Sequence, residues 1–109
     1  MNVLDELTQV LAQRKSEDPN TSYVASLHAK GLNMILEKVG EEATEVILAA
    51  KDAGSSVGTK TEVVKETADL WFHTMVMLSE LDLSAKDVLD ELAGRFSVSG
   101  HDEKAARKS

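Results

Sequence analysis

The chain has 109 residues, of which 12 are Lys or Arg and 19 are Asp or Glu, so its formal net charge is −7. This acidic balance argues against nucleic acid and anionic membrane surfaces as the main partners, because both are bound through Lys and Arg. The absence of cysteine excludes disulfides, thiolate zinc sites, iron–sulfur clusters and cysteine nucleophiles. The length fits a single domain over residues 1–109. Without a signal peptide or a long apolar run, we expect a cytoplasmic protein.

Apolar residues recur at helical spacing through most of the chain and predict four helices. The first is expected over about residues 2–14. Residues 15–30 follow as a long loop that begins with a cluster of Ser, Asp, Pro, Asn and Thr, and its length makes it a candidate functional segment. The second helix is expected over about residues 31–53, and a Gly/Ser-rich break ends it.

The third helix is expected over about residues 60–81, and its wide apolar sector indicates contacts with more than one partner helix. Trp71 and the methionines lie at helical spacing and are predicted to be core residues. Ser84 with an acid three residues later predicts the N-cap of a fourth helix that ends near Phe96. Residues 98–109 form a charged tail, for which a frayed end and a lid over a site are equally good interpretations. The predicted fold is a small all-α bundle.

Two pairs of acids lie three residues apart on neighbouring predicted helices. Glu42 and Glu45 belong to the second helix, and Glu66 and Asp69 belong to the third. Residues at this spacing share one face of a helix, and the short connection favours antiparallel neighbours. Four carboxylates facing one another would repel and raise their pKa values, which one or two Mg²⁺ ions would relieve.

The alternative is that these acids are the solvated faces of two helices, as most charge runs are. A helical wheel separates the two interpretations at one position, because Glu42 falls within or at the edge of the apolar sector, where an unpaired carboxylate is costly. Glu45 falls at the polar edge, and the positions of Glu66 and Asp69 favour neither interpretation. His73, four residues after Asp69, fits an ordinary edge histidine better than a residue that orients a ligand carboxylate.

The acidic residues and their surroundings resemble a known enzyme family. Glu41-Glu42-Ala43-Thr44-Glu45 followed by Glu66-Thr67-Ala68-Asp69 is similar to the MazG-like all-α nucleotide pyrophosphohydrolases. Ser22-Tyr23, the run Lys38-Val39-Gly40 before the acids, Leu70-Trp71-Phe72-His73 after them and the basic tail look closer to the phosphoribosyl-ATP pyrophosphatases. The resemblance covers nearly the whole chain, although the residues after Tyr23 and the 52–60 connection match no pattern of the family.

The resemblance implies a MazG-like bundle completed by homodimerisation. It also implies Mg²⁺-dependent cleavage of the α–β phosphoanhydride of 1-(5-phosphoribosyl)-ATP to 1-(5-phosphoribosyl)-AMP and pyrophosphate, the second step of histidine biosynthesis. In this interpretation, the metal ligands are Glu42, Glu45, Glu66 and Asp69. Glu41 is a further catalytic candidate that binds metal, holds water or pairs with a lysine. The candidate residues for binding this small nucleotide are Ser22, Tyr23, Lys38, Lys104 and Arg107.

Two other functions stay open on the sequence. The acidic motif alone fits a house-cleaning nucleoside triphosphate pyrophosphohydrolase equally well. A non-catalytic helical dimerisation module is the alternative from another class, and it predicts that Mg²⁺ leaves the melting temperature unchanged.

Overall fold

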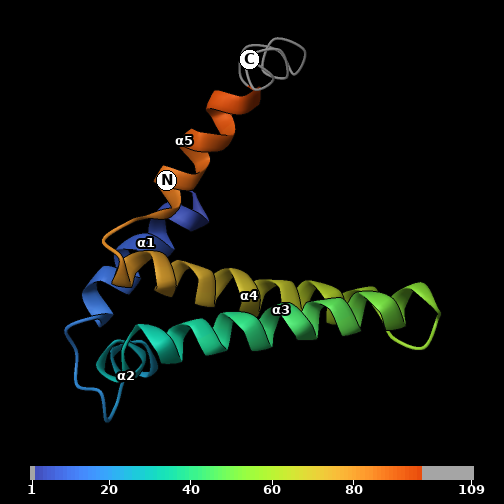
Figure 1. Cartoon of the computed structure of the whole chain (residues 1–109), viewed down its shortest axis with the longest axis horizontal. Coiled ribbons are helices and arrows are strands. Elements are labelled where there is room, and N and C mark those ends of the chain that lie inside the picture. The colour runs from blue at the N-terminus through green and yellow to red at the C-terminus, as the bar shows by residue number, and fades with distance from the viewer. Residues whose placement is uncertain (1, 97–109) are drawn as a thin grey trace.

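The computed structural model describes residues 2–96, and all regular secondary structure in this part of the chain is helical (Figure 1). It contains five helices, which are α1 (Val3–Arg14), α2 (Tyr23–Lys30), α3 (Leu32–Gly54), α4 (Lys60–Glu80) and α5 (Ala85–Phe96). The predicted all-α class is therefore confirmed, and the four expected helices agree with α1, α3, α4 and α5 to within one or two residues at their ends. No described helix is long and apolar enough to span a bilayer.

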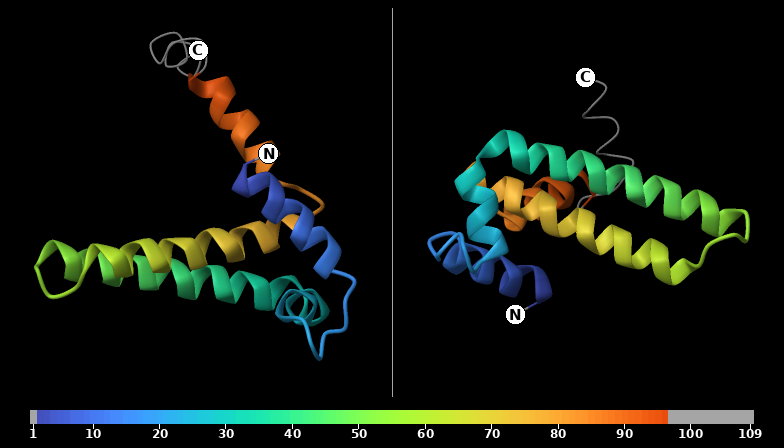
Figure 2. Two further views of the ribbon diagram at one scale, coloured as in Figure 1. Left: turned by 180° about the vertical axis from the view of Figure 1, so that it is seen from behind. Right: turned by 90° about the horizontal axis from the view of Figure 1, so that it is seen from below.

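The long helices α3 and α4 form an antiparallel hairpin, which is the largest part of the molecule. The two helices lie side by side in every view (Figures 1 and 2). Their connection is closed at Asp52, whose carbonyl oxygen accepts hydrogen bonds from the amides of Val57 and Gly58, both at 2.9 Å. A Cβ atom on Gly58 would lie 3.0 Å from the Cβ of Asp52, so the tight turn favours glycine at this position. This hairpin brings the acidic segments of α3 and α4 face to face.

The prediction of a loop over residues 15–30 was wrong for its second half, which forms α2. Ser22 is the N-cap, and its hydroxyl accepts a hydrogen bond from the amide of Ala25 at 3.2 Å. Gly31, with φ of +95°, ends the helix in a conformation that L side chains rarely adopt. With only eight residues, α2 is too short to show clear periodicity, and it is stabilised by burial of Val24 and Leu27.

The core lies at one end of the hairpin, where α1 and α2 cross it. Its buried side chains come from all five helices: Leu11, Val24, Leu27, Ile35, Met75, Val76 and Ala85. Ile35 and Val76 are fully buried, and they anchor α3 and α4 respectively. The other end of the hairpin carries exposed apolar residues, among them Ile47, Leu48 and Val64.

Helix α5 projects away from the hairpin and packs against α1 (Figures 1 and 2). Its start agrees with the predicted cap, since the Asp87 carboxylate accepts a hydrogen bond from the amide of Ser84 at 2.9 Å. An apolar groove of about 390 Å³ separates α5 from α4, and Trp71, Leu78, Val88, Leu89 and Leu92 are among its lining residues. The prediction that Trp71 belongs to the core was wrong for the single chain, because the residue is 59% exposed in this groove.

Candidate functional site

Three acidic side chains meet midway along the α3–α4 hairpin. Glu42 and Glu45 extend from α3 and Glu66 from α4, and each offers a carboxylate oxygen that lies within 4.8 Å of the others. One oxygen of Glu42 and one of Glu66 are buried and have no hydrogen-bond partner. Buried polar atoms are normally paired, so these two oxygens indicate that the cluster is built to receive a cation or a proton donor.

The pKa values of the cluster also indicate that its carboxylates are crowded together. The pKa of Glu42 is raised above its usual value, first by burial and then by a hydrogen bond and the charge of Glu45. The pKa of Glu66 is also raised, first by a hydrogen bond to Glu45 and then by burial. Both pKa shifts therefore come from crowding of carboxyl groups around Glu45. A divalent cation would relieve the repulsion.

The fourth predicted ligand, Asp69, lies one turn beyond Glu66 on α4 and is exposed. Its carboxylate is outside the group of three, but its charge still contributes to the raised pKa values of both Glu42 and Glu66. Asp69 therefore borders the cluster. The site geometry alone supports three ligands and leaves the fourth as a prediction.

Glu41 and Lys38 form an ion pair on the exposed side of α3. The Lys38 ammonium lies 3.3 Å from a carboxylate oxygen of Glu41, and this hydrogen bond raises the pKa of Lys38. Among the roles left open for Glu41, the structure favours pairing with a lysine. Lys38 also lies close enough to Tyr23 for its charge to lower the pKa of that phenol, so its side chain faces the region between α2 and α3.

Ser22 and Tyr23, which were predicted to bind substrate, both lie at the start of α2 but have different contacts. Ser22 is occupied as the helix cap. Tyr23 opens the helix, and its hydroxyl forms a hydrogen bond of 2.8 Å with Nε2 of His73 on α4. The Tyr23 ring stacks on Phe72 at a centroid distance of 6.3 Å. Tyr23 therefore links α2 to the segment of α4 that follows Asp69.

His73 differs from the expected edge histidine, because it is 7% exposed. Its Nδ1 lies 2.8 Å from the carbonyl oxygen of Asp69 and its Nε2 meets the Tyr23 hydroxyl. The imidazole thus contacts the backbone of Asp69, and within residues 2–96 it forms no hydrogen bond to a carboxylate. Sequence reasoning missed this link because it depends on α2. The sequence did carry a signal for that helix, because Ser22 is a typical N-cap residue and Gly31 is a typical residue at a helix end.

The acidic cluster opens into a groove between α3 and α4 that continues toward their connecting turn. The groove has a volume of about 310 Å³ and is lined by Glu45, Leu48, Ala49, Asp52, Gly58, Glu62 and Glu66. Four of these seven residues are acids, so a phosphate group would be repelled here unless cations neutralised the field.

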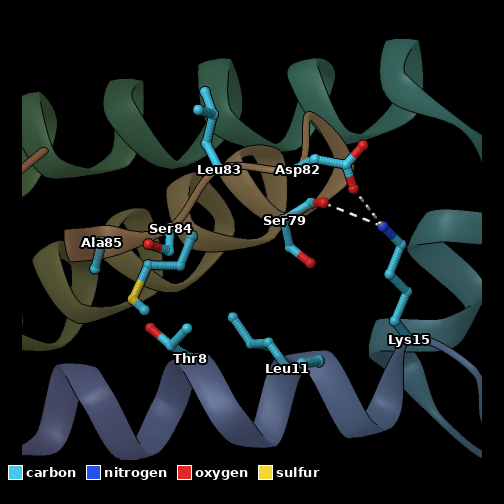
Figure 3. Close-up of a pocket in the computed structure, with 10 residues that line it drawn as sticks. Thr8, Leu11, Lys15, Ser79, Asp82, Leu83, Ser84 and Ala85 are labelled. Carbon is cyan, nitrogen blue, oxygen red and sulfur yellow. Dashed lines mark hydrogen bonds and ion pairs between the residues drawn. The ribbon is translucent and has the colours of Figure 1, made fainter. Parts of the chain in front are cut away.

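A second hollow, of about 250 Å³, lies on the other side of α4, between α1 and the corner that joins α4 to α5 (Figure 3). Here the Lys15 ammonium donates a hydrogen bond to the carbonyl oxygen of Ser79 at 3.1 Å and lies 4.0 Å from Asp82. Among the described residues, none of those predicted from the sequence to act in a site lines this hollow. We interpret the contacts as a structural tie between the end of α1 and the end of α4.

The remaining predicted site residues, Lys104 and Arg107, belong to the 98–109 tail and lie outside the described residues. Whether they close over a substrate stays a prediction from the family resemblance.

Comparison with known families identifies the family of the chain. Residues 4–96 match the family model of phosphoribosyl-ATP pyrophosphohydrolase. The match covers the five helices from near the start of α1 to the end of α5, including every member of the acidic cluster. The chain therefore belongs to the phosphoribosyl-ATP pyrophosphohydrolase family, which is a family of hydrolases.

Proposed function

We propose that the protein hydrolyses 1-(5-phosphoribosyl)-ATP at the α–β phosphoanhydride in a Mg²⁺-dependent reaction. The products would be 1-(5-phosphoribosyl)-AMP and pyrophosphate, as in the second step of histidine biosynthesis. The single observation that carries the metal-dependent part is the cluster of Glu42, Glu45 and Glu66, with its two buried and unpartnered carboxylate oxygens. Family membership supports the substrate.

The donor set fits Mg²⁺, which prefers carboxylate oxygens and retains several water ligands. Glu42, Glu45 and Glu66 would hold the ion, and Asp69, whose charge reaches the cluster, would be the fourth ligand. When bound, Mg²⁺ would neutralise phosphate charge and lower the pKa of a water ligand.

The protein's own residues would orient the nucleotide around this centre. Lys38, held by Glu41 at 3.3 Å, offers a positive charge for a phosphate at the α2 side of the cluster. Tyr23, held in place by Phe72 and His73, lies within reach of the Lys38 charge and would contact the nucleotide beside it. Lys104 and Arg107 would add positive charge if the tail closes over the site, and Ser22 would act through the position of α2.

We also propose that the chain acts as a homodimer. The α4–α5 groove exposes apolar side chains such as Trp71 and Leu92, and patches of this kind on soluble chains mark interaction sites. Because α5 packs against α1 and leaves one of its apolar edges exposed, a second copy would complete the bundle by covering it.

The decisive experiment measures pyrophosphate release from phosphoribosyl-ATP and from a panel of nucleoside triphosphates, with Mg²⁺ and with EDTA. We expect strong preference for phosphoribosyl-ATP and dependence on Mg²⁺. Glu66→Gln should abolish release, whereas the matched control Glu37→Gln, which removes the same charge from an exposed position on α3, should not. Equal turnover of the panel would favour a house-cleaning pyrophosphohydrolase. Absence of any turnover by folded protein would favour a dimerisation module.

A further inference from the structure

The hydrogen bonds around His73 have a defined direction. Its Nδ1 lies 2.8 Å from the carbonyl oxygen of Asp69, and a carbonyl can only accept a hydrogen bond. Nδ1 must therefore carry the proton. In a neutral imidazole the other nitrogen is then an acceptor, so Nε2 accepts the hydrogen bond from the Tyr23 hydroxyl at 2.8 Å.

This direction fixes what Tyr23 can offer to a ligand. A phenol has one proton, and here that proton is directed at His73. Any further partner of the Tyr23 oxygen must therefore be a donor. Phosphate oxygens near neutral pH are mainly acceptors, so they are poor partners, while sugar hydroxyls and amines are good ones.

Aromatic neighbours surround the His73–Tyr23 pair. His73 is buried, and its ring meets Phe72 and Tyr23 edge to face at centroid distances of 5.1 and 5.8 Å. The Tyr23 ring is also stacked on Phe72. Tyr23 itself remains 50% exposed, so the phenol is anchored on one side and accessible on the other.

Tyr23 is also linked to the edge of the acidic cluster, because its partner His73 contacts the carbonyl oxygen of Asp69, one turn from Glu66. Burial raises the pKa of its phenol, the charge of Lys38 lowers it, and the charges of Glu42, Glu41 and Asp69 raise it further. The phenol therefore lies within the field of the proposed metal site.

We propose that His73 is a positioning residue that orients Tyr23 as a hydrogen-bond acceptor for a hydroxyl or amine of the nucleotide, and not as a donor to its phosphates. The inference rests on the proposed function, since it names the part of that substrate which Tyr23 recognises. Tyr23 would thus contribute to nucleoside recognition, and the phosphates would be left to the cations and to Lys38.

The direction of the bond can be tested without catalysis. Long-range ¹H–¹⁵N spectra of protein labelled at histidine, recorded at about pH 8 with Mg²⁺, report which ring nitrogen carries the proton. His73→Gln identifies the resonance. We expect a proton on Nδ1 alone. A proton on Nε2, or on both nitrogens, would overturn the proposal, and this result does not depend on whether the protein hydrolyses phosphoribosyl-ATP.

The recognition role is tested by Tyr23→Phe, which removes the hydroxyl and keeps the ring. We expect KM for phosphoribosyl-ATP to rise about threefold to tenfold, as for the loss of one hydrogen bond, with kcat nearly unchanged. Inhibition by inorganic pyrophosphate, which has phosphate oxygens but no sugar or base, should be unaffected. Weakening of pyrophosphate inhibition by the same factor, or an unchanged KM, would overturn the proposal.

The positioning role is tested by a double-mutant cycle. His73→Leu should raise KM by about the same factor as Tyr23→Phe, and the double variant should be no worse than either one. His73→Gln, whose amide oxygen can still accept from Tyr23, should largely restore KM. Additive effects, or a loss confined to kcat, would refute the role. If His73→Leu does not fold, the spectra and the Tyr23→Phe measurements decide. If the wild-type protein binds pyrophosphate but does not hydrolyse phosphoribosyl-ATP, it is the proposed function that fails.

Discussion

Replacing Glu42 with Gln should make the metal-free protein more stable and remove its response to Mg²⁺. Acids on helices usually contribute little to stability, so this expectation is specific to the cluster. Gln has almost the shape of Glu, carries no charge, and can donate from its amide to the carboxylate of Glu45. It would therefore relieve repulsion and also satisfy the buried position that now holds an unpartnered oxygen.

The structure sets the size of the effect. Two ionised carboxylates within the 4.8 Å found here repel by about 3 kcal/mol at an effective dielectric constant of about 20. The raised pKa of Glu42 and screening by solvent reduce much of this repulsion, and we expect a net gain of about 1 kcal/mol. For a domain of this length, that corresponds to a rise in Tm of about 4–8 °C.

Thermal unfolding at fixed protein concentration, in EDTA and in excess Mg²⁺, measures both effects. In the wild-type protein, free Mg²⁺ at about 100 times its Kd should add about 2.7 kcal/mol. Glu42→Gln should start from a higher Tm in EDTA and gain little from Mg²⁺. Glu37→Gln is the matched control, with the same change of charge on the same helix. A lower Tm for Glu42→Gln in EDTA, or an equal gain for both variants, would refute the reasoning.

Four further expectations follow from the same contacts. Because the pKa values of Glu42 and Glu66 are raised above 4.5 in the folded protein, each carboxyl favours the folded state most below its unfolded pKa and loses this contribution as pH rises through its folded pKa. In urea titrations with EDTA, the stability advantage of Glu42→Gln should therefore be small near pH 4 and grow toward pH 7; a constant advantage would contradict this. Trp71→Lys should shift the protein from dimer to monomer in light-scattering measurements, and an unchanged mass would exclude the α4–α5 groove as the interface. Ser22→Ala should cost about 1 kcal/mol through loss of the α2 cap, and Ser22→Asp should restore it in denaturant titrations. Ile35→Ala should cost about 2–5 kcal/mol by the same measurement, since the side chain is fully buried.

The helices that bury a regular apolar face were predictable from the sequence, and so was the meeting of Glu42, Glu45 and Glu66. Spacing places each acid on a helix face, and a short connection brings the faces together. Glu42 was the most informative residue, because its place near the apolar sector anticipated the buried oxygen found in the structure.

The failures have a common physical cause, which is that short helices and single-chain surfaces depend on tertiary contacts. Helix α2 is held by its cap and by two buried side chains, so periodicity alone did not reveal it. The burial of His73 depends on contact with α2 and was missed for the same reason. Trp71 was assigned to the core because helical spacing identifies an apolar face without identifying which molecule covers that face.

The placement of the aromatic residues also gives the protein two separate optical reporters. The sequence has one tryptophan and one tyrosine. Trp71 lines the groove between α4 and α5, whereas Tyr23, at the start of α2, is hydrogen-bonded to His73 and lies within the field of the acidic cluster. Covering the groove would transfer the indole to an apolar environment and shift its emission to shorter wavelength, while a nucleotide at the cluster would perturb the phenol absorption. Assembly and ligand binding can therefore be followed independently in the unlabelled wild-type chain.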